Sequence, residues 1–453
     1  MSYWLSFNLV ELRFILIPMR QLPATVLVIF GITGDLSHRK LLPALAEIKR
    51  AGQLPAKFKL VGVSRRKILK TQVLPEGCTN LADVLETQTM DVTSPEDYEK
   101  LKQKLDAYGR NYQIIFYFAV PPRAVLPIVR QLAGVGLNQP HTKLLLEKPF
   151  GVDHQSAKEL ISEIDAHFKE HQVFRIDHYL AKEMAQNITV FLGSNTIFRD
   201  LWNNQFIESI EVTALEKIGI EGRIELWEST GTLRDFVQSH LLQLTALILM
   251  KPCSDIFDFD EIPRRRLAAL NAIKPADPAK AIRGQYKDYR QEVGNVDSFV
   301  ESFVKLTVES TDRRWRGVPI QLMTGKKIDE KFTAIRVRFK QTDTSSTNLL
   351  IFRIQPNEGI EIDLWVKKPG LKRELQKLKL DFSYDQSSRL PDAYEMVIID
   401  AIRSNHSLFA SSAEVLASWK ILQPVLETWQ KNGQGLKFYK PGSTYEEVLA
   451  KPN

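Results

Sequence analysis

The chain has 453 residues, of which 44% are hydrophobic and 25% are charged, the profile of a globular protein rather than a fibrous or disordered one. Its length predicts more than one domain, at the usual ~150 residues per domain. The formal net charge of +7 favours an anionic ligand, but no basic cluster interleaved with aromatic residues argues for nucleic-acid binding. Cys78 and Cys253 form neither a metal-binding nor a disulfide pattern, so we expect a cytoplasmic protein with no metal.

Residues 1–23 combine apolar and charged side chains. Glu11 and Arg13 interrupt the apolar residues, and the run Phe14–Ile17 is too short for the core of a signal peptide or a membrane span. We therefore expect a dispensable N-terminal extension with no membrane role, and Met19 is an alternative start.

A predicted strand, a glycine turn and a helix follow this extension. Thr25–Phe30 is an apolar, β-branched run, as in strands buried on both faces of a parallel sheet. Residues 37–52 then place leucines and isoleucines at helical spacing. Glycines between a strand and a helix let backbone N–H groups approach a pyrophosphate. The turn is therefore predicted to bind a dinucleotide, with Gly31, Thr33, Gly34, Asp35 and Leu36 as the contacts.

The second predicted strand, Phe58–Val63, indicates which dinucleotide is bound. An acidic residue at this strand end holds the ribose 2′-hydroxyl of NAD, whereas an arginine accommodates the 2′-phosphate of NADP. Here Ser64, Arg65 and Arg66 follow the strand, and no acid stands there. NADP is therefore the predicted coenzyme. The alternative is that the two arginines are ordinary solvated surface residues.

Two later strands end in polar side chains, which is where open α/β sheets bind ligands. Lys143–Glu147 leads into Lys148 and Pro149, a candidate cis bond, and a lysine there can donate to a sugar hydroxyl. Residues 172–176 lead into Asp177 and His178, a pair that in isolation more often belongs to an ordinary surface turn. Residues 24–178 are thus predicted to be a Rossmann-like dinucleotide-binding domain.

Residues 179–453 show a different pattern. Ile207–Val212 and segments around residues 335–339 and 360–366 alternate with period two, as strands with one exposed face do. We expect a larger β+α domain with a mostly antiparallel sheet and helices on one side. Its helix over 231–250 carries His240 at the edge of an apolar stripe, where a buried core histidine is the usual interpretation.

Several longer strings resemble the glucose-6-phosphate dehydrogenase family. They are GITGDLSHRKLLPAL from residue 31, EKPFG from residue 147, RIDHYLAKE from residue 175, RDFVQSHLLQ from residue 234, and the RWRGVP and TGK strings from residues 314 and 324. The resemblance covers roughly residues 24–439 and implies oxidation of D-glucose 6-phosphate to 6-phosphoglucono-δ-lactone, with NADP as hydride acceptor and a dimer built on the large sheet. It also implies a homodimer or a dimer of dimers.

The resemblance also assigns residues to roles. It implies that His240 is the general base and that Asp177 orients it. It places Lys40 near the nicotinamide and the sugar, and Lys148 between sugar and coenzyme. The implied substrate-binding residues are Lys148, His178, Tyr179, Lys182, Glu216, Asp235, Lys326 and Lys331.

Some positions depart from the family pattern. The family's Y-Y-D is Leu226-Trp227-Glu228 here, and Met323 stands where an arginine usually precedes T-G-K. Met323 argues against the extra structural NADP site of some members, because it cannot pair with a phosphate. Two alternatives stay open: another sugar oxidoreductase, since E-K-P also occurs in glucose–fructose oxidoreductase-like enzymes, and a silent binding protein, which is expected to lack His240 or Asp177.

The arginines after the second strand lead to a prediction about coenzyme choice. Replacing Arg65 and Arg66 by Ala should raise KM for NADP at least about tenfold, because a charged hydrogen bond contributes roughly 1.5–3 kcal/mol. Steady-state kinetics with both coenzymes measure this, and the NAD kinetics, which lack the 2′-phosphate, serve as the control. Equal efficiency of the parent protein with NAD and NADP contradicts the prediction.

Overall fold

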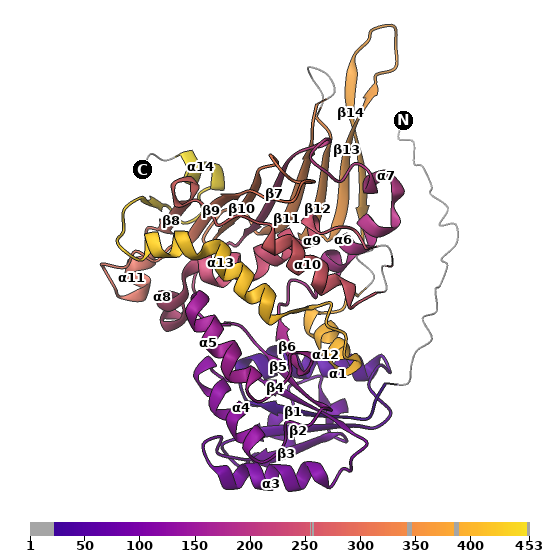
Figure 1. Ribbon diagram of the computed structural model, residues 1–453, viewed down its shortest axis with the longest axis vertical. Coiled ribbons are helices and arrows are strands. Elements are labelled where there is room, and N and C mark those ends of the chain that lie inside the picture. The colour runs from indigo at the N-terminus through magenta and orange to yellow at the C-terminus, as the bar shows by residue number, and fades with distance from the viewer. Residues whose placement is uncertain (1–21, 254, 256–257, 342–346, 385–388, 451–453) are drawn as a thin grey trace.

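The computed structural model describes residues 22–450, except 254, 256–257, 342–346 and 385–388 (Figure 1). The predicted extension therefore lies almost wholly outside the described residues. Within the described part of the chain, no helix is long and apolar enough to cross a membrane.

The first domain is built on a seven-stranded sheet in the order β15-β6-β5-β4-β1-β2-β3. Every pair is parallel except β15 with β6. The strand order 3-2-1-4-5-6 is that of a dinucleotide-binding doubly wound fold, so the predicted Rossmann-like domain is confirmed. Its strands are β1 Thr25–Phe30, β2 Phe58–Ser64, β3 Leu85–Thr89, β4 Gln113–Phe118, β5 Thr142–Leu146, β6 Val173–Ile176 and β15 Phe409–Ala410.

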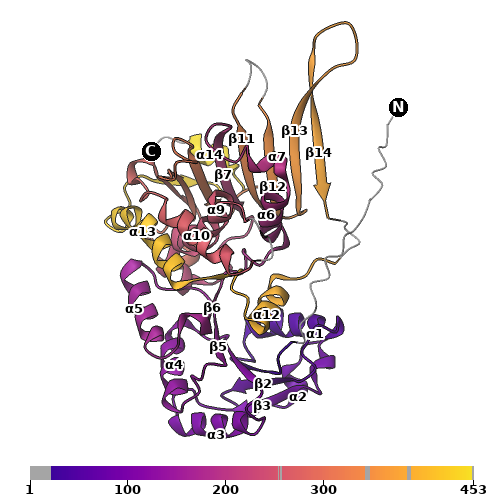
Figure 2. The same ribbon diagram turned by 45° about the vertical axis from the view of Figure 1, so that its right-hand side comes forward.

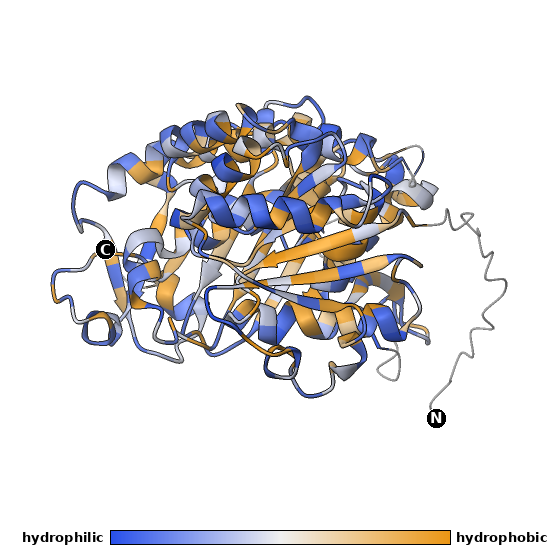
Figure 3. Cartoon of the chain, turned by 90° about the horizontal axis from the view of Figure 1, so that it is seen from below, coloured by the Kyte–Doolittle hydropathy of each residue, from blue (hydrophilic) through white to orange (hydrophobic). Residues whose placement is uncertain are grey.

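Helices cover both faces of this sheet, and Figure 3 shows largely hydrophobic strands among these helices. Every residue of β1 and β5, and all but the first of β4, is accordingly buried. The π-helical turn η1 and the helix α1 together form the helix predicted after the glycine turn. The covering helices are η1 Ser37–Leu41, α1 Leu42–Arg50, α2 Lys70–Val73, α3 Pro95–Asp106, α4 Val125–Gly134, α5 His154–Asp165 and α12 Ala393–Arg403.

One helix and one strand of this domain come from late in the chain. Figure 2 shows α12 beside α1, and the apolar face of α12, with Val397, Ile398, Ala401 and Ile402, is buried in the same core as Leu45. Strand β15 follows and pairs with β6. The predicted boundary at residue 178 stays a prediction, but the first sheet and its core draw on residues from the predicted second domain.

The second domain is built on a nine-stranded sheet in the order β14-β13-β12-β11-β7-β10-β9-β8-β16. Only the pairs β10–β7 and β16–β8 are parallel, so the prediction of a mostly antiparallel sheet is confirmed. The strands are β7 Ile207–Leu215, β8 Ile282–Tyr286, β9 Phe303–Val308, β10 Ile320–Gly325, β11 Phe332–Phe339, β12 Leu349–Gln355, β13 Gly359–Lys367, β14 Leu375–Ser383 and β16 Leu436–Tyr439.

Most helices pack on one face of this sheet, and β13 and β14 project beyond them (Figures 1 and 2). The prediction of helices on one side holds for these, but the short helix α14 packs on the other face, against Leu215 and Met323. The principal helices are α6 Glu183–Ser194, α8 Ile224–Thr232, α9 Leu242–Leu249, α10 Glu261–Asn271 and α13 Ser412–Trp429, and α7 Thr196–Arg199, α11 Tyr289–Val293 and α14 Tyr445–Ala450 are shorter. Between α8 and α9 lies η5, Leu233–Leu241, a π-helical segment of the kind often found at functional sites.

A buried ion pair joins the late segments to this helical layer. Arg266 on α10 and Glu414 on α13 are both fully buried, and Arg266 Nε donates to Glu414 Oε1 at 2.8 Å. The same guanidinium donates to the carbonyls of Ser407 and Phe409. Arg266 therefore connects α10 to α13 and to the backbone that carries β15.

This pair leads to a stability prediction. Arg266→Met should lower the free energy of unfolding by about 3–5 kcal/mol, because it leaves the Glu414 carboxylate buried without a partner. Urea unfolding followed by circular dichroism measures the change. Arg264→Met, on the exposed side of the same helix, is the control and should change stability little. A loss of less than about 1 kcal/mol in Arg266→Met contradicts the role of the pair.

Candidate active site

A cavity of about 360 Å³ lies where the two domains meet. Lys148 reaches it from the end of β5, and His178 and Tyr179 reach it from the turn after β6. Nine residues predicted from the sequence line this cavity together: Lys148, His178, Tyr179, Lys182, Glu216, Asp235, His240, Lys326 and Lys331. The fold thus brings side chains from both domains to one site.

Asp177 and His240 form a buried pair at the wall of this cavity. The Nδ1 atom of His240 lies 2.7 Å from Oδ1 of Asp177, and both side chains are almost fully buried. The backbone N–H of Tyr179 also donates to Asp177 Oδ1, at 2.9 Å. The Tyr179 ring stacks on the imidazole with 4.4 Å between centroids, and His178 meets it edge-on at 4.5 Å. These contacts fix the orientation of the His240 ring.

Lys148 occupies the other side of the imidazole. Its Nζ lies 3.0 Å from His240 Nε2 and 2.8 Å from Oδ1 of Asp235, and it also donates to the Asp235 carbonyl. The peptide bond between Lys148 and Pro149 is cis, as considered from the sequence. The ammonium group can only donate, so Nε2 must be the acceptor, which requires a neutral ring with its proton on Nδ1.

Burial and charge together set the protonation of this pair. Burial lowers the pKa of His240 and outweighs the attraction of the Asp177 carboxylate, with Lys148 acting in the same direction as burial. Burial by itself raises the pKa of Asp177, but the attraction of His240 and the hydrogen bond to it lower that pKa to about 2. At neutral pH the site therefore holds a carboxylate and a neutral imidazole, the form of histidine that can accept a proton.

A basic group of side chains lies further along the cavity. Lys182 lies over the Tyr179 ring, with Nζ 5.6 Å from the centroid. Burial lowers the pKa of Lys182, and the positive charges of Lys40 and Lys331 lower it further. Tyr179 Oη accepts a hydrogen bond from Gln355 Nε2 at 3.1 Å. Cations and hydroxyl donors grouped in this way suit a phosphate group.

Two carboxylates, those of Glu216 and Asp235, also line the cavity. Glu216, after β7, pairs with the buried Lys326, whose Nζ also lies 4.6 Å from the centre of the Trp227 ring. Asp235 pairs with Lys148. Carboxylates held by lysines can accept hydrogen bonds from sugar hydroxyls without leaving an unpaired charge.

The departures from the family pattern take up distinct places. Leu226 lines the cavity, Trp227 is buried beneath Lys326, and Glu228 bonds instead with Tyr289, Asn295 and Ser298. Met323 is 2% exposed and belongs to the apolar core of the second domain, so it contributes to packing.

The glycine turn has the shape that a dinucleotide requires. Gly31 has φ of 83°, and a Cβ atom there would lie 2.1 Å from the carbonyl oxygen of Ala119. Only glycine therefore fits between β1 and the end of β4, where the turn leads directly into η1. Arg65 and Arg66 are exposed at the end of the adjacent strand β2, and Ser64 Oγ accepts from the Arg66 backbone N–H at 3.2 Å. These residues fit a dinucleotide whose ribose carries a phosphate.

Lys40 does not line the cavity. Its Nζ pairs with Asp392 Oδ2, the N-cap residue of α12, at 2.9 Å, and both side chains are about half-exposed. An exposed ion pair contributes at most ~1 kcal/mol, so a bound coenzyme can replace it. The predicted position of Lys40 near nicotinamide and sugar stays a prediction.

Sequence reasoning missed several residues of the cavity wall, and the polar ones are Arg223, Thr230, Arg234, Gln238 and Gln355. Gln355 ends β12 and donates to Tyr179, and Arg223 precedes α8. The only sequence signal near Gln355 is the turn that follows it, Pro356 to Gly359, which marks a strand end and not a binding residue. Among the described residues, no group of three or more His, Cys, Asp or Glu side chains is arranged to hold a metal ion.

A dinucleotide-binding domain joined to a sheet domain, with a histidine–carboxylate pair between them, defines a dehydrogenase that uses a nicotinamide coenzyme. Comparison with known families makes this specific. Residues 28–187 match the model of the NAD binding domain of glucose-6-phosphate dehydrogenase, and residues 189–450 match that of its C-terminal domain. The chain belongs to the glucose-6-phosphate dehydrogenase family.

Individual relatives agree with this assignment. The chain is 37% identical to glucose-6-phosphate 1-dehydrogenase of Chlamydia muridarum (strain MoPn / Nigg), over 90% of this chain and 91% of that protein. It is 35% identical to the protein of the same name from Bacillus subtilis (strain 168), over 93% and 95% of the two chains. A solved glucose-6-phosphate dehydrogenase in complex with glucose 6-phosphate superposes with a TM-score of 0.88 at 31% identity, over 95% of this chain and 98% of that one.

The protonation of the buried pair leads to a prediction. In NMR spectra of histidine-labelled protein, the His240 ring should stay neutral at pH 7 and carry its proton on Nδ1. It should become charged only as the pH falls below the ordinary histidine value of 6.5, because burial and Lys148 disfavour the imidazolium. The spectrum of His240→Asn identifies the signal by its absence. A His240 ring that is already charged at pH 7 contradicts the prediction.

Proposed function

We propose that this protein oxidises D-glucose 6-phosphate to 6-phospho-D-glucono-1,5-lactone and reduces NADP+ to NADPH, the entry reaction of the oxidative pentose phosphate pathway. The observation that carries the proposal is the contact between His240 and Asp177, which holds a neutral imidazole at a cavity that also contains basic side chains. Membership of the family supports the reaction, and the geometry supports the residue roles given next.

His240 acts as the general base. Oxidation removes a proton from the C1 hydroxyl and a hydride from C1, and the Nε2 atom of a neutral imidazole can accept the proton. Asp177 keeps the proton of the free ring on Nδ1 and stabilises the imidazolium that forms, as the aspartate of a serine-protease triad does. NADP+, when bound, supplies the hydride acceptor.

Lys148 releases His240 when substrate binds. In the described structure its ammonium group donates to Nε2, the atom that must accept the proton. A sugar hydroxyl placed between the two side chains accepts from Lys148 and donates to Nε2, so neither group loses a partner. Asp235 keeps the ammonium in position through this exchange.

The phosphate of the substrate is held by His178, Tyr179, Lys182 and Lys331, and the sugar hydroxyls by Glu216, Asp235 and Lys326. All of them line the cavity that His240 shares. The coenzyme is held by the turn from Gly31 to Leu36, with Lys40, and by Arg65 and Arg66 at its 2′-phosphate. Lys148 faces both ligands.

The protein is proposed to act in the cytoplasm as a homodimer or a dimer of dimers. Both cysteines are unpaired and buried, which fits a reducing compartment. The longer helices lie on one face of the large sheet (Figure 1), and the short helix α14 covers only one end of the other face, which leaves the rest of that face for a second subunit. Neither nucleic acid nor a membrane is a proposed partner.

One assay tests the reaction and the base together. Purified protein should form NADPH with glucose 6-phosphate far more efficiently than with glucose, because glucose lacks the phosphate that the basic side chains hold. His240→Asn should lower kcat by about 10²–10⁴, the usual contribution of a positioned base, and should change the affinity for glucose 6-phosphate little. His141→Asn, at an exposed position in the first domain, is the matched control.

Two outcomes contradict parts of this proposal. If glucose is oxidised as efficiently as its 6-phosphate, the protein is another sugar oxidoreductase of related fold. The proposed phosphate-binding role of His178, Tyr179, Lys182 and Lys331 is then wrong. If His240→Asn keeps more than about a tenth of the parent kcat, the general-base assignment fails and His240 is a core histidine.

A further inference from the structure

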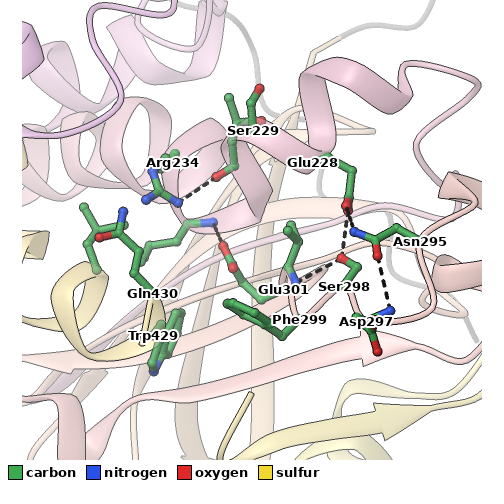
Figure 4. Close-up of a pocket in the computed structure, with 14 residues that line it drawn as sticks. Glu228, Ser229, Arg234, Asn295, Asp297, Ser298, Phe299, Glu301, Trp429 and Gln430 are labelled. Atoms are coloured by element: carbon green, nitrogen blue, oxygen red, sulfur yellow. Dashed lines mark hydrogen bonds between the residues drawn. The ribbon is translucent and has the colours of Figure 1, made fainter. Parts of the chain in front are cut away.

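A second cavity, of about 400 Å³, lies at the start of η5, the segment that carries His240. Its walls are the start of η5, the loop between α11 and β9, and the last turns of α13 (Figure 4). It shares Thr230 and Arg234 with the active-site cavity, whereas His240 and Asp177 are not part of it. None of the roles proposed above uses this cavity.

A buried carboxyl group, that of Glu301, faces this cavity. Glu301 is 6% exposed, and its Oε1 accepts from the backbone N–H of Leu233 at 2.8 Å. The backbone N–H of Glu301 itself is a second backbone donor to the carboxyl group, and no side chain among the described residues donates to it. Burial raises the pKa of Glu301 and outweighs these backbone hydrogen bonds, which lower it.

The backbone is shaped around this carboxyl group. Gly231 has φ of 64°, and a Cβ atom there would lie 2.6 Å from Glu301 Oε1. The turn into η5 therefore requires glycine for two reasons, its backbone conformation and the close approach of the carboxyl group. Because Glu301 lines the cavity and no described side chain donates to it, a ligand in the cavity can supply a donor to this carboxyl group.

The charges around the cavity favour a cationic partner. Glu228, Asp297 and Glu301 line it, and Arg234 is the one cation among the described lining residues. Glu228 accepts from three neutral donors, so its negative charge stays unneutralised.

The neighbouring guanidinium groups do not replace such a partner. Arg234 donates to the carbonyls of Val152 and Thr230. Arg283, behind the Trp429 ring, donates to the carbonyls of Trp429, Asn432 and Gln434. Both guanidinium groups favour the charged form of Glu301, yet burial outweighs them.

An apolar wall lies beside the carboxyl group. Phe299, Leu426 and Trp429 line the cavity, and Figure 4 shows the Phe299 and Trp429 side chains close to Glu301. Phe299 is 37% exposed, although a free aromatic ring is normally buried. Flat apolar surface next to a carboxylate suits a ligand that joins a cation to a planar body.

We propose that this cavity binds a small organic cation with a planar apolar body, the cation paired with Glu301 and the body placed against Phe299 and Trp429. The site is separate from the proposed substrate and coenzyme sites and does not depend on the proposed reaction.

Benzamidine is the probe that tests this site, because its planar amidinium can pair with a carboxylate and its ring matches the apolar wall. Isothermal titration calorimetry on the full chain without substrate should show binding. Glu301→Gln should weaken it at least about tenfold, since a charged hydrogen bond is lost, and Phe299→Ala should also weaken it. Benzamide, the neutral isostere, should bind at least about tenfold more weakly than benzamidine to the parent protein.

Two controls separate this cavity from the other carboxylates. Glu309→Gln, at an exposed pair with Lys274 and Lys280, should leave benzamidine binding unchanged. Saturating glucose 6-phosphate should not displace benzamidine, since the two cavities share only Thr230 and Arg234. Unchanged affinity in Glu301→Gln, or full displacement by glucose 6-phosphate, overturns the proposal. If Glu301→Gln does not fold, Phe299→Ala decides, and unchanged affinity in that variant overturns it. The titration needs no catalysis, so it fails or succeeds independently of the dehydrogenase assay.

Discussion

The contact between Asp177 and His240 is the interaction on which the site depends, because it joins residues that belong to different domains. Asp177 follows β6 of the parallel sheet, and His240 lies on η5, packed against the antiparallel sheet. A 2.7 Å contact leaves little freedom for one domain to move relative to the other at this point. The domain junction is therefore an electrostatic contact as well as an apolar one, and the cavity lined by both domains depends on the junction being held at this place.

Burial sets the protonation state of the imidazole in this contact. In water an imidazole beside a carboxylate gains a proton more readily, but here the loss of solvent and the Lys148 ammonium reverse that tendency. The same low-polarity surroundings strengthen the hydrogen bonds that hold Lys148 to Asp235. A more open site with the same residues would hold a charged histidine over more of the pH range, and so less of the neutral imidazole that can accept a proton.

Much of the fold was predictable because its signals are local. Apolar runs gave β1, β2 and β5, and the Gly31 turn was recognisable from the strand before it and the helix after it. Residue roles could be assigned only through family strings, since spacing alone left His240 as a core residue, and these roles stay predictions. Contacts between distant segments were not predictable: α12 packing on α1, the Lys40–Asp392 pair, and Gln355 against Tyr179. The helix predicted from Gly231 begins later because that residue has a positive φ.

The placement of α12 and β15 has a consequence for how the protein is synthesised. The nucleotide-binding core includes apolar side chains from residues 397–409, which leave the ribosome long after residues 24–178. At ~5–20 residues per second, the interval is on the order of tens of seconds. During that time β6 is the edge strand of the nascent first domain, because its partner β15 has not been made. The apolar surface beside α1 is also uncovered. The emerging chain is then most exposed to aggregation, and the segment that ends this exposure is one of the last to be translated.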